Sequence, residues 1–174
     1  IVEMWNSGTF AKPATRVREM AQFLRQALAG ERVVFYGQTF HVDGFRLSRP
    51  IEQPVPIHVA ALREGMLNVA GEVGDGAIIN WLSAEDCRKS IAVVREAATD
   101  AGREPASIEI TARLMVNIDP PGPEGDLGRR RLINAYLKVP GYRAFHEWLG
   151  RGEARKGMWD AWEGGARKGA VAAI

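Results

Sequence analysis

The sequence predicts an α/β fold with parallel strands, and two patterns support that prediction. Between residues 57 and 118, short apolar runs of the kind found in strands covered on both faces alternate with segments of helical periodicity. The strand–helix–strand units recur about every 25 residues, a spacing typical of parallel strands joined by right-handed crossovers. A β-hairpin precedes these units and helices lie at both ends of the chain.

Length and composition indicate one globular domain spanning residues 1–174. Hydrophobic residues make up 46% of the chain and charged residues 25%. The net charge is only +2 with both signs interspersed, so neither nucleic acid nor a membrane surface is expected as a partner. The basic run Arg129–Arg131 is expected to form a solvated helix face.

Cysteine usage and hydropathy indicate a cytoplasmic protein. The single cysteine, Cys87, excludes an intramolecular disulfide and an all-cysteine metal site, and no metal is expected. It falls on the apolar side of a predicted helix, so we expect a buried, inert thiol. No apolar run approaches the roughly 20 residues of a membrane span, so neither a membrane span nor a targeting leader is expected.

The first part of the chain is predicted to be a helix followed by a hairpin. Residues 13–29 carry an apolar stripe at helical spacing, with proline at the start and Gly30 just past the end. The segment "RVVFYGQTFHVDGF" alternates apolar and polar residues around Gly37 and Gln38, as a hairpin does. The proline-rich "RPIEQPVP" that follows is expected to be an extended linker.

The β/α units begin after this linker. A buried strand is predicted over 57–62, a helix over 66–73 and a second buried strand over 77–81, with "GDG" as the turn between the last two. Ser83 and Asp86 form the spacing of a capping box for the next helix.

That helix is predicted to end at about Ala101, and the following residues alternate cleanly. The alternation over 108–118 predicts a third strand. After the loop "DPPGPEGD" the chain turns helical to its end, with Asp126 as the expected cap.

Ligands of parallel β/α folds bind at the carboxyl ends of the strands. The first such end runs from Ala60 to Met66, where unpaired N–H groups at a helix start favour an anion. The second runs from Asn80 to Ser83, and the third holds Met115, Asn117 and Asp119. From turn chemistry alone, the alternative for the first strand end is a purely structural role. The alternative for Trp81 is a packing role.

Two adjoining segments resemble one protein family. "RVREMAQFLRQALAGERVVFYGQTFHV" and "PIHVAALREGMLNVAGEVGDGAIINWLS" are similar to the luciferase-like monooxygenases, closest to their deazaflavin-dependent oxidoreductase branch, over about residues 1–118. The resemblance implies a partial TIM (β/α)8 barrel, in which the three predicted strands correspond to the fifth, sixth and seventh. The first four strands and the eighth are expected to be absent from this chain. In the helical tail, Met158, Trp159 and Trp162 are expected in a core against the barrel, with a partner surface as the alternative.

The resemblance also implies a cofactor, deazaflavin coenzyme F420 or alternatively FMN, and residues that hold it. Its phosphate-bearing tail would meet the backbone after the first strand, and its ring or the substrate would lie beside the end of the second. The cofactor-binding residues so implied are Ala60, Ala61, Leu62, Arg63, Gly65, Met66, Asn80, Trp81 and Ser83.

By this resemblance the intact protein transfers hydride between the reduced deazaflavin and a small organic substrate. The alternatives are an FMN-dependent monooxygenase and a non-catalytic barrel fragment that serves as an association module. A homodimer is expected for the full-length protein. The sequence identifies no catalytic acid, base or nucleophile, and structural or surface roles are expected for His41, His58 and His146.

Overall fold

A computed structural model of the protein describes residues 8–49, 51–116, 118 and 122–174. The chain forms two compact units, Ile1–Arg113 and Leu114–Ile174. The single domain expected for residues 1–174 stays a prediction. Among the described residues, no helix is both long and apolar enough to cross a lipid bilayer.

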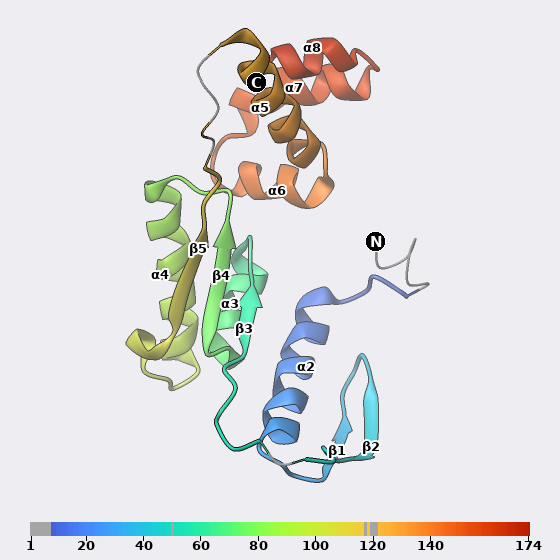
Figure 1. The fold of residues 1–174 in the computed structure, drawn as a ribbon, viewed down its shortest axis with the longest axis vertical. Coiled ribbons are helices and arrows are strands. Elements are labelled where there is room, and N and C mark those ends of the chain that lie inside the picture. Colours follow the sequence, from blue (N-terminus) through green and yellow to red (C-terminus); the bar gives the residue numbers. More distant parts are fainter. Residues whose placement is uncertain (1–7, 50, 117, 119–121) are drawn as a thin grey trace. The chain divides into compact units, whose positions relative to one another are not determined.

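The first unit begins with the predicted helix and hairpin (Figure 1). Helix α2 (Pro13–Leu28) has proline in its first turn, where a missing N–H costs nothing. Strands β1 (Val33–Tyr36) and β2 (His41–Phe45) pair antiparallel. Phe23 of α2 packs edge-on against Phe45, with ring centroids 5.5 Å apart, so the hairpin and the helix share an aromatic contact.

Glu19 of α2 ties the hairpin turn to the helix. Its carboxylate, in a residue only 8% exposed, accepts hydrogen bonds from the N–H of Gln38 (2.6 Å) and from the N–H (3.0 Å) and hydroxyl (2.5 Å) of Thr39. The Thr39 hydroxyl holds the pKa of Glu19 below its ordinary value, although burial opposes this. A Cβ at Gly37 would lie 2.6 Å from this carboxyl group, so a larger residue there would displace the Glu19 carboxylate from these hydrogen bonds.

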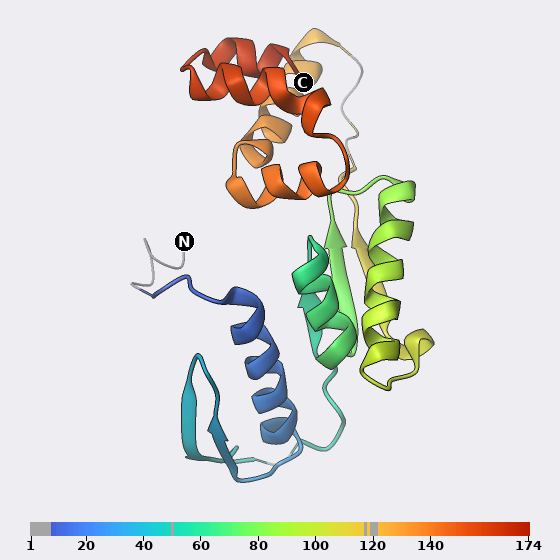
Figure 2. The ribbon, with the colours of Figure 1, turned by 180° about the vertical axis from the view of Figure 1, so that it is seen from behind.

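The centre of the first unit is a three-stranded parallel sheet, as predicted. Strands β3 (His58–Ala60), β4 (Gly76–Asn80) and β5 (Glu109–Arg113) lie in the order β3-β4-β5. Helices α3 (Glu64–Val73) and α4 (Ala84–Asp100) connect them. Both helices cover the same face of the sheet (Figure 2). A 3₁₀ turn, η1 (Pro105–Ser107), leads into β5.

Burial in the sheet is one-sided. Val59, Ala77 and Ile79 are buried on the face that the helices cover, each at most 4% exposed. Residues of the opposite face, such as Ala60 and Thr111, are exposed. The expectation that these strands are covered on both faces is therefore not met within the described residues, because no described element packs on this second face.

Asp75 aligns the starts of the three strands. Its N–H donates to the Ile57 carbonyl (2.7 Å), its carboxylate accepts from the Ile57 N–H (2.7 Å), and its carbonyl accepts from the Glu109 N–H (3.0 Å). Arg25 of α2 donates to the same carboxylate at 3.0 Å. Burial works to raise the pKa of Asp75, but the bonds from Ile57 and Arg25 outweigh it, and the pKa is lowered.

Two predicted strands are too long. The first spans only 58–60 rather than 57–62, and the third ends at Arg113 rather than at residue 118. Arg113 pairs with Asn80, the last residue of β4, so the chain beyond it has no strand partner in the sheet. Val116 is accordingly 82% exposed and Ile118 91% exposed.

The second unit is helical, as predicted. It contains α5 (Pro123–Leu137), α6 (Pro140–Trp148), α7 (Gly152–Glu163) and α8 (Arg167–Ala172). Leu137, Met158, Trp159 and Ala170 form its core, with Trp162 partly buried against them. The methionine and the two tryptophans thus contribute to the core of the helical unit, and their expected packing against the barrel stays a prediction.

Three side-chain expectations differ from the structure. Gly122 is the residue before α5, so Asp126 does not cap the helix but lies inside it, where it accepts from Arg129. Arg129 and Arg130 are half-buried, which leaves only Arg131 on the solvated face. Cys87 is half-buried rather than buried, although its neighbour Asp86 in the same turn of α4 is buried.

The histidines lie in structural or surface positions. His41 is exposed and its ring stacks on Tyr36. His58 is half-buried on the second face of the sheet, with its Nε2 3.7 Å from a carboxylate oxygen of Glu109. His146 is buried in α6. These positions agree with the structural and surface roles expected for them.

Gly71 allows α3 and α4 to pack closely. A Cβ at Gly71 would lie 2.3 Å from the Val94 carbonyl oxygen, whereas one at Gly65, in the same helix, would meet nothing within 4 Å. We predict that Gly71→Ala lowers the free energy of unfolding by about 1–3 kcal/mol. Gly65→Ala should be neutral or stabilising by up to about 1 kcal/mol. Urea denaturation measures both, and equal effects would contradict the close contact.

The lowered pKa of Asp75 predicts a pH-dependent stability. A carboxylate with a depressed folded-state pKa stabilises the fold above its unfolded value, here 3.8, and loses that contribution as the pH falls through the folded value. Asp75→Asn should therefore be less stable than the wild type at pH 7, and the gap should shrink below about pH 4. Denaturation across this range checks it. Asp43→Asn, which changes an exposed carboxylate of β2, serves as the control and should show no such gap.

Candidate functional site

The carboxyl ends of β3 and β4 lie at one edge of the sheet. Ala60 pairs with Ile78 and Asn80 pairs with Arg113, so the two predicted turns leave neighbouring strands in the same direction. The structure thus brings together the segments 60–66 and 80–83, which the sequence assigned to a cofactor site. The end of β5 adds Arg113 to this edge.

A row of main-chain donors opens the turn after β3. Helix α3 begins without a side-chain cap, because its N-cap residue Arg63 has extended backbone (φ −126°, ψ 169°) and makes no capping bond. Leu62, Arg63, Glu64 and Gly65 have N–H groups with no recorded acceptor among the described residues. Such groups carry partial positive charge at a helix start, and an anion there is stabilised.

Two residues of the same turn have their N–H groups committed elsewhere. The Ala61 N–H donates to the Ile78 carbonyl at 2.9 Å, and the Met66 N–H donates to the Arg63 carbonyl at 2.9 Å. Ala61 is also only 4% exposed. A cofactor contact from Ala61 or Met66 therefore stays a prediction. Any such contact cannot use the main-chain N–H group of either residue, because both are already bonded. Glu64 is not among the residues predicted to bind the cofactor, but its main-chain N–H is available as a donor.

The donor row is accessible. Ala60, Arg63 and Gly65 are exposed, and the space beside Gly65 is open for 4 Å around an added Cβ. The guanidinium of Arg63 adds positive charge, whereas the exposed carboxylate of Glu64, in the first helical turn, opposes an incoming anion. The turn therefore offers main-chain donors together with two side-chain charges of opposite sign.

Trp81, the residue that follows β4, has an unusual backbone conformation. Its φ is 59°, in the left-handed region that costs a residue with a Cβ about 1–2 kcal/mol. Trp81 and the preceding Asn80 are half-buried. The left-handed residue turns the chain out of the sheet, which explains why β4 stops at Asn80 and why β5 has no partner beyond Arg113.

Ser83 caps α4, as predicted. Its hydroxyl donates to the Asp86 carboxylate at 2.7 Å and accepts from the Asp86 N–H at 3.2 Å, and its N–H donates to the same carboxylate at 2.9 Å. These bonds satisfy donors at the start of the helix. Contact between Ser83 and a ligand stays a prediction, as does contact from Asn80 and Trp81.

The third strand end differs from the one predicted. Asn117 and Asp119 lie outside the described residues, and Met115 is exposed beyond the end of the strand. Arg113 occupies the position in register with Asn80. Sequence alternation extended the strand past this arginine, and only the pairing with β4 reveals where the strand ends.

Comparison with solved structures shows the fold. The F420-dependent tetrahydromethanopterin reductase from Methanopyrus kandleri matches with a TM-score of 0.71 at 22% identity, covering 93% of this chain and 47% of that one. An F420-dependent secondary alcohol dehydrogenase matches with a TM-score of 0.57 at 19% identity, over 64% of this chain and 34% of that one.

Comparison by sequence identifies relatives that are named for the reactions they catalyse. A 5,10-methylenetetrahydromethanopterin reductase from Methanolobus tindarius is 31% identical over 111 residues, which are 64% of this chain and 34% of that protein. An F420-dependent glucose-6-phosphate dehydrogenase from Gordonia bronchialis is 31% identical over 113 residues, or 64% and 33%. The matched segment thus covers about a third of the length of each of these curated relatives.

The family model for luciferase-like monooxygenases matches residues 1–174. Together with the parallel sheet and its helices, this match confirms the predicted α/β fold of luciferase-like type and the family resemblance. The chain belongs to the luciferase-like monooxygenase family.

Proposed function

We propose that the protein containing this chain is a deazaflavin-dependent oxidoreductase that transfers hydride between coenzyme F420 and a small organic substrate. The relatives reported above include an F420-dependent glucose-6-phosphate dehydrogenase and a 5,10-methylenetetrahydromethanopterin reductase, which are named for different substrates. They support the cofactor class and leave the organic substrate open. A bound deazaflavin supplies a hydride carrier that does not readily activate oxygen, and the protein supplies position and electrostatics.

The observation that carries this proposal is the row of free donors from Leu62 to Gly65 at the carboxyl edge of the sheet. A phosphate in the cofactor tail accepts such hydrogen bonds, and the dipole of α3 favours its charge. Arg63 attracts the anion, and the small side chain of Ala60 lets a ligand approach the backbone. These residues fit a phosphate-bearing group by the chemistry of their donors.

The strain at Trp81 supports a ligand site at the neighbouring strand end. Residues held in sparsely populated backbone conformations cluster at functional sites, where surrounding structure maintains them. With a φ of 59°, Trp81 lies one strand away from the donor row. We assign to it the wall beside the cofactor ring or the substrate.

The family description favours a second candidate, an FMN-dependent monooxygenase. FMN also carries a phosphate, so the donor row serves both cofactors equally. The exposed second face of the sheet favours a different class of function, an association module. Cofactor titration separates the three, because an association module binds neither cofactor.

We predict that the 174-residue chain binds F420 more tightly than FMN, and that its reduced F420 complex consumes no oxygen. Fluorescence titration measures the two affinities, and an oxygen electrode measures uptake. Tighter FMN binding with oxygen uptake would instead support the monooxygenase. Absence of binding to either cofactor would overturn the assignment of the donor row in this chain.

Substitution of Glu64 isolates a single main-chain donor. The preceding residue, Arg63, is extended, which suits it to precede proline, and proline is tolerated at the first helical position. Glu64→Ala removes the opposing carboxylate and keeps the N–H, so F420 affinity should rise. Glu64→Pro removes the N–H as well, and should bind about tenfold more weakly than Glu64→Ala. Equal affinities would show that this N–H does not contact the cofactor.

Substitution of Trp81 tests the strain directly. Glycine adopts positive φ without cost, whereas alanine does not. We predict that Trp81→Gly is more stable to urea than Trp81→Ala by about 1 kcal/mol. At the adjacent Leu82, which lacks positive φ, the order should reverse because glycine has the greater unfolded-state entropy. The same order at both positions would argue against strain.

A further inference from the structure

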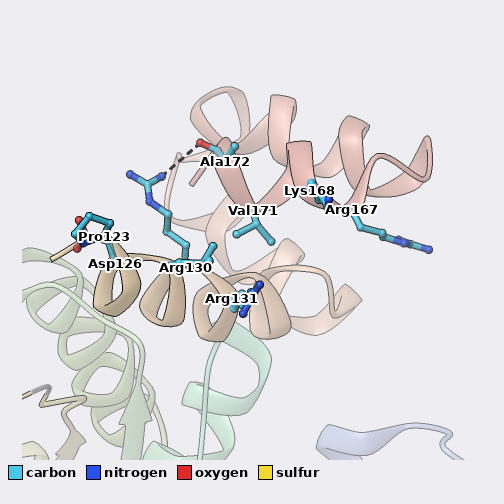
Figure 3. A pocket seen from close by; sticks show the side chains of 9 residues that line it. Pro123, Asp126, Arg130, Arg131, Arg167, Lys168, Val171 and Ala172 are labelled. Carbon is cyan, nitrogen blue, oxygen red and sulfur yellow. Dashed lines mark hydrogen bonds between the residues drawn. The ribbon is translucent and has the colours of Figure 1, made fainter. Parts of the chain in front are cut away.

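We propose that the groove between α5 and α8 is a second binding site, for a small anionic molecule with an apolar body. The groove encloses about 780 Å³, within the range of small-molecule sites. It lies wholly in the second unit, Leu114–Ile174, and shares no residue with the donor row after β3. Figure 3 shows its two walls, formed by the helices themselves.

The groove has apolar walls. Leu127 of α5 and Val171 and Ala172 of α8 line it. Leu127 is 41% exposed, so the groove offers apolar surface to solvent. Burying such surface against a hydrocarbon or aromatic group contributes about 25 cal/mol per Å². The apolar body of a ligand would occupy this part.

Four cations and one carboxylate also line the groove, so its charge is strongly positive. They are Arg130, Arg131, Arg167, Lys168 and Asp126. The carboxylate is already paired, because Asp126 accepts from Arg129. The excess of cations over unpaired carboxylates selects an anion as the ligand's polar group.

Two of the four cations have structural partners. Arg130 donates to the Ile174 carbonyl and, at 3.4 Å, to the Ala172 carbonyl, which holds the end of α8 against α5. The guanidinium carbon of Arg167 lies 3.8 Å from the centroid of the Trp162 ring, and one of its nitrogens donates to the Trp162 carbonyl at 2.8 Å. These two arginines therefore shape the groove.

The other two cations are available to a ligand. Within the described part of the chain, Arg131 of α5 and Lys168 of α8 have no recorded hydrogen-bond or ion-pair partner. They come from opposite walls, with the apolar Val171 between their helices (Figure 3). An anionic headgroup held by Arg131 and Lys168 would leave an attached apolar chain on Val171 and Leu127.

Calorimetric titration of the 174-residue chain with three probes tests the class of ligand. Decanoate has an anionic head and an apolar chain, acetate has the head alone, and decyltrimethylammonium has a chain with a cation. We expect decanoate to bind most tightly, with an affinity that falls as salt is added. Equal binding of decanoate and decyltrimethylammonium would overturn the proposal, as would equal binding of acetate.

Variants locate the site. Combining Arg131→Gln with Lys168→Gln should weaken decanoate binding about fivefold, whereas Lys156→Gln, which removes an exposed cation of α7 outside the groove, should leave it unchanged. Val171→Ser should weaken binding without altering its salt dependence. Circular dichroism verifies that each variant is folded. Unchanged decanoate affinity in the folded double variant would overturn the proposal.

Discussion

Asp75 joins the starts of all three parallel strands and the helix that precedes them, and the candidate site at the opposite edge depends on that junction. Its main chain bonds to Ile57 and Glu109, and its carboxylate bonds to Ile57 and Arg25. With the strand starts aligned, Ala60 and Asn80 finish at the same edge of the sheet. The two candidate turns are thus positioned by a carboxylate at the far end of the strands, and parallel β/α folds are expected to divide stability and function between their two ends in this way.

The candidate site relies on main-chain groups more than on side chains. Its donors are N–H groups left unpaired just before α3 and in its first turn, while the nearby side chains of Arg63 and Glu64 carry opposite charges. Backbone donors are fixed by the fold and hold a phosphate in many sequence contexts. A site built on backbone donors needs no unusual side chains, and family resemblance pointed to this candidate turn more clearly than any individual side chain did.

Helical periodicity, strand alternation and short apolar runs bounded by turn residues together predicted the element order from α2 to the helical tail. These patterns failed where long-range contacts decide the outcome. The end of β5 is set by Trp81, whose left-handed backbone terminates the neighbouring strand. The carboxylate of Glu19 bonds to Gln38 and Thr39, which follow it by 19 and 20 positions in the sequence. No local pattern reveals such a contact. Arg113 was missed because a neighbouring strand sets the end of β5. The bond from the Ala61 N–H to Ile78 of β4 is likewise long-range, whereas the bond from the Met66 N–H to the Arg63 carbonyl is local.

The most direct measurement of the central claim is the response of individual amides in a ¹⁵N-labelled chain to added F420. If the turn after β3 holds the phosphate of the cofactor, the largest ¹H and ¹⁵N shift changes will fall on Leu62, Arg63, Glu64 and Gly65. Their saturation will follow the same affinity as the fluorescence of the cofactor. The claim that this turn holds the phosphate would be contradicted by saturable binding that leaves the signals of these four amides unchanged and shifts the signals of residues elsewhere in the chain.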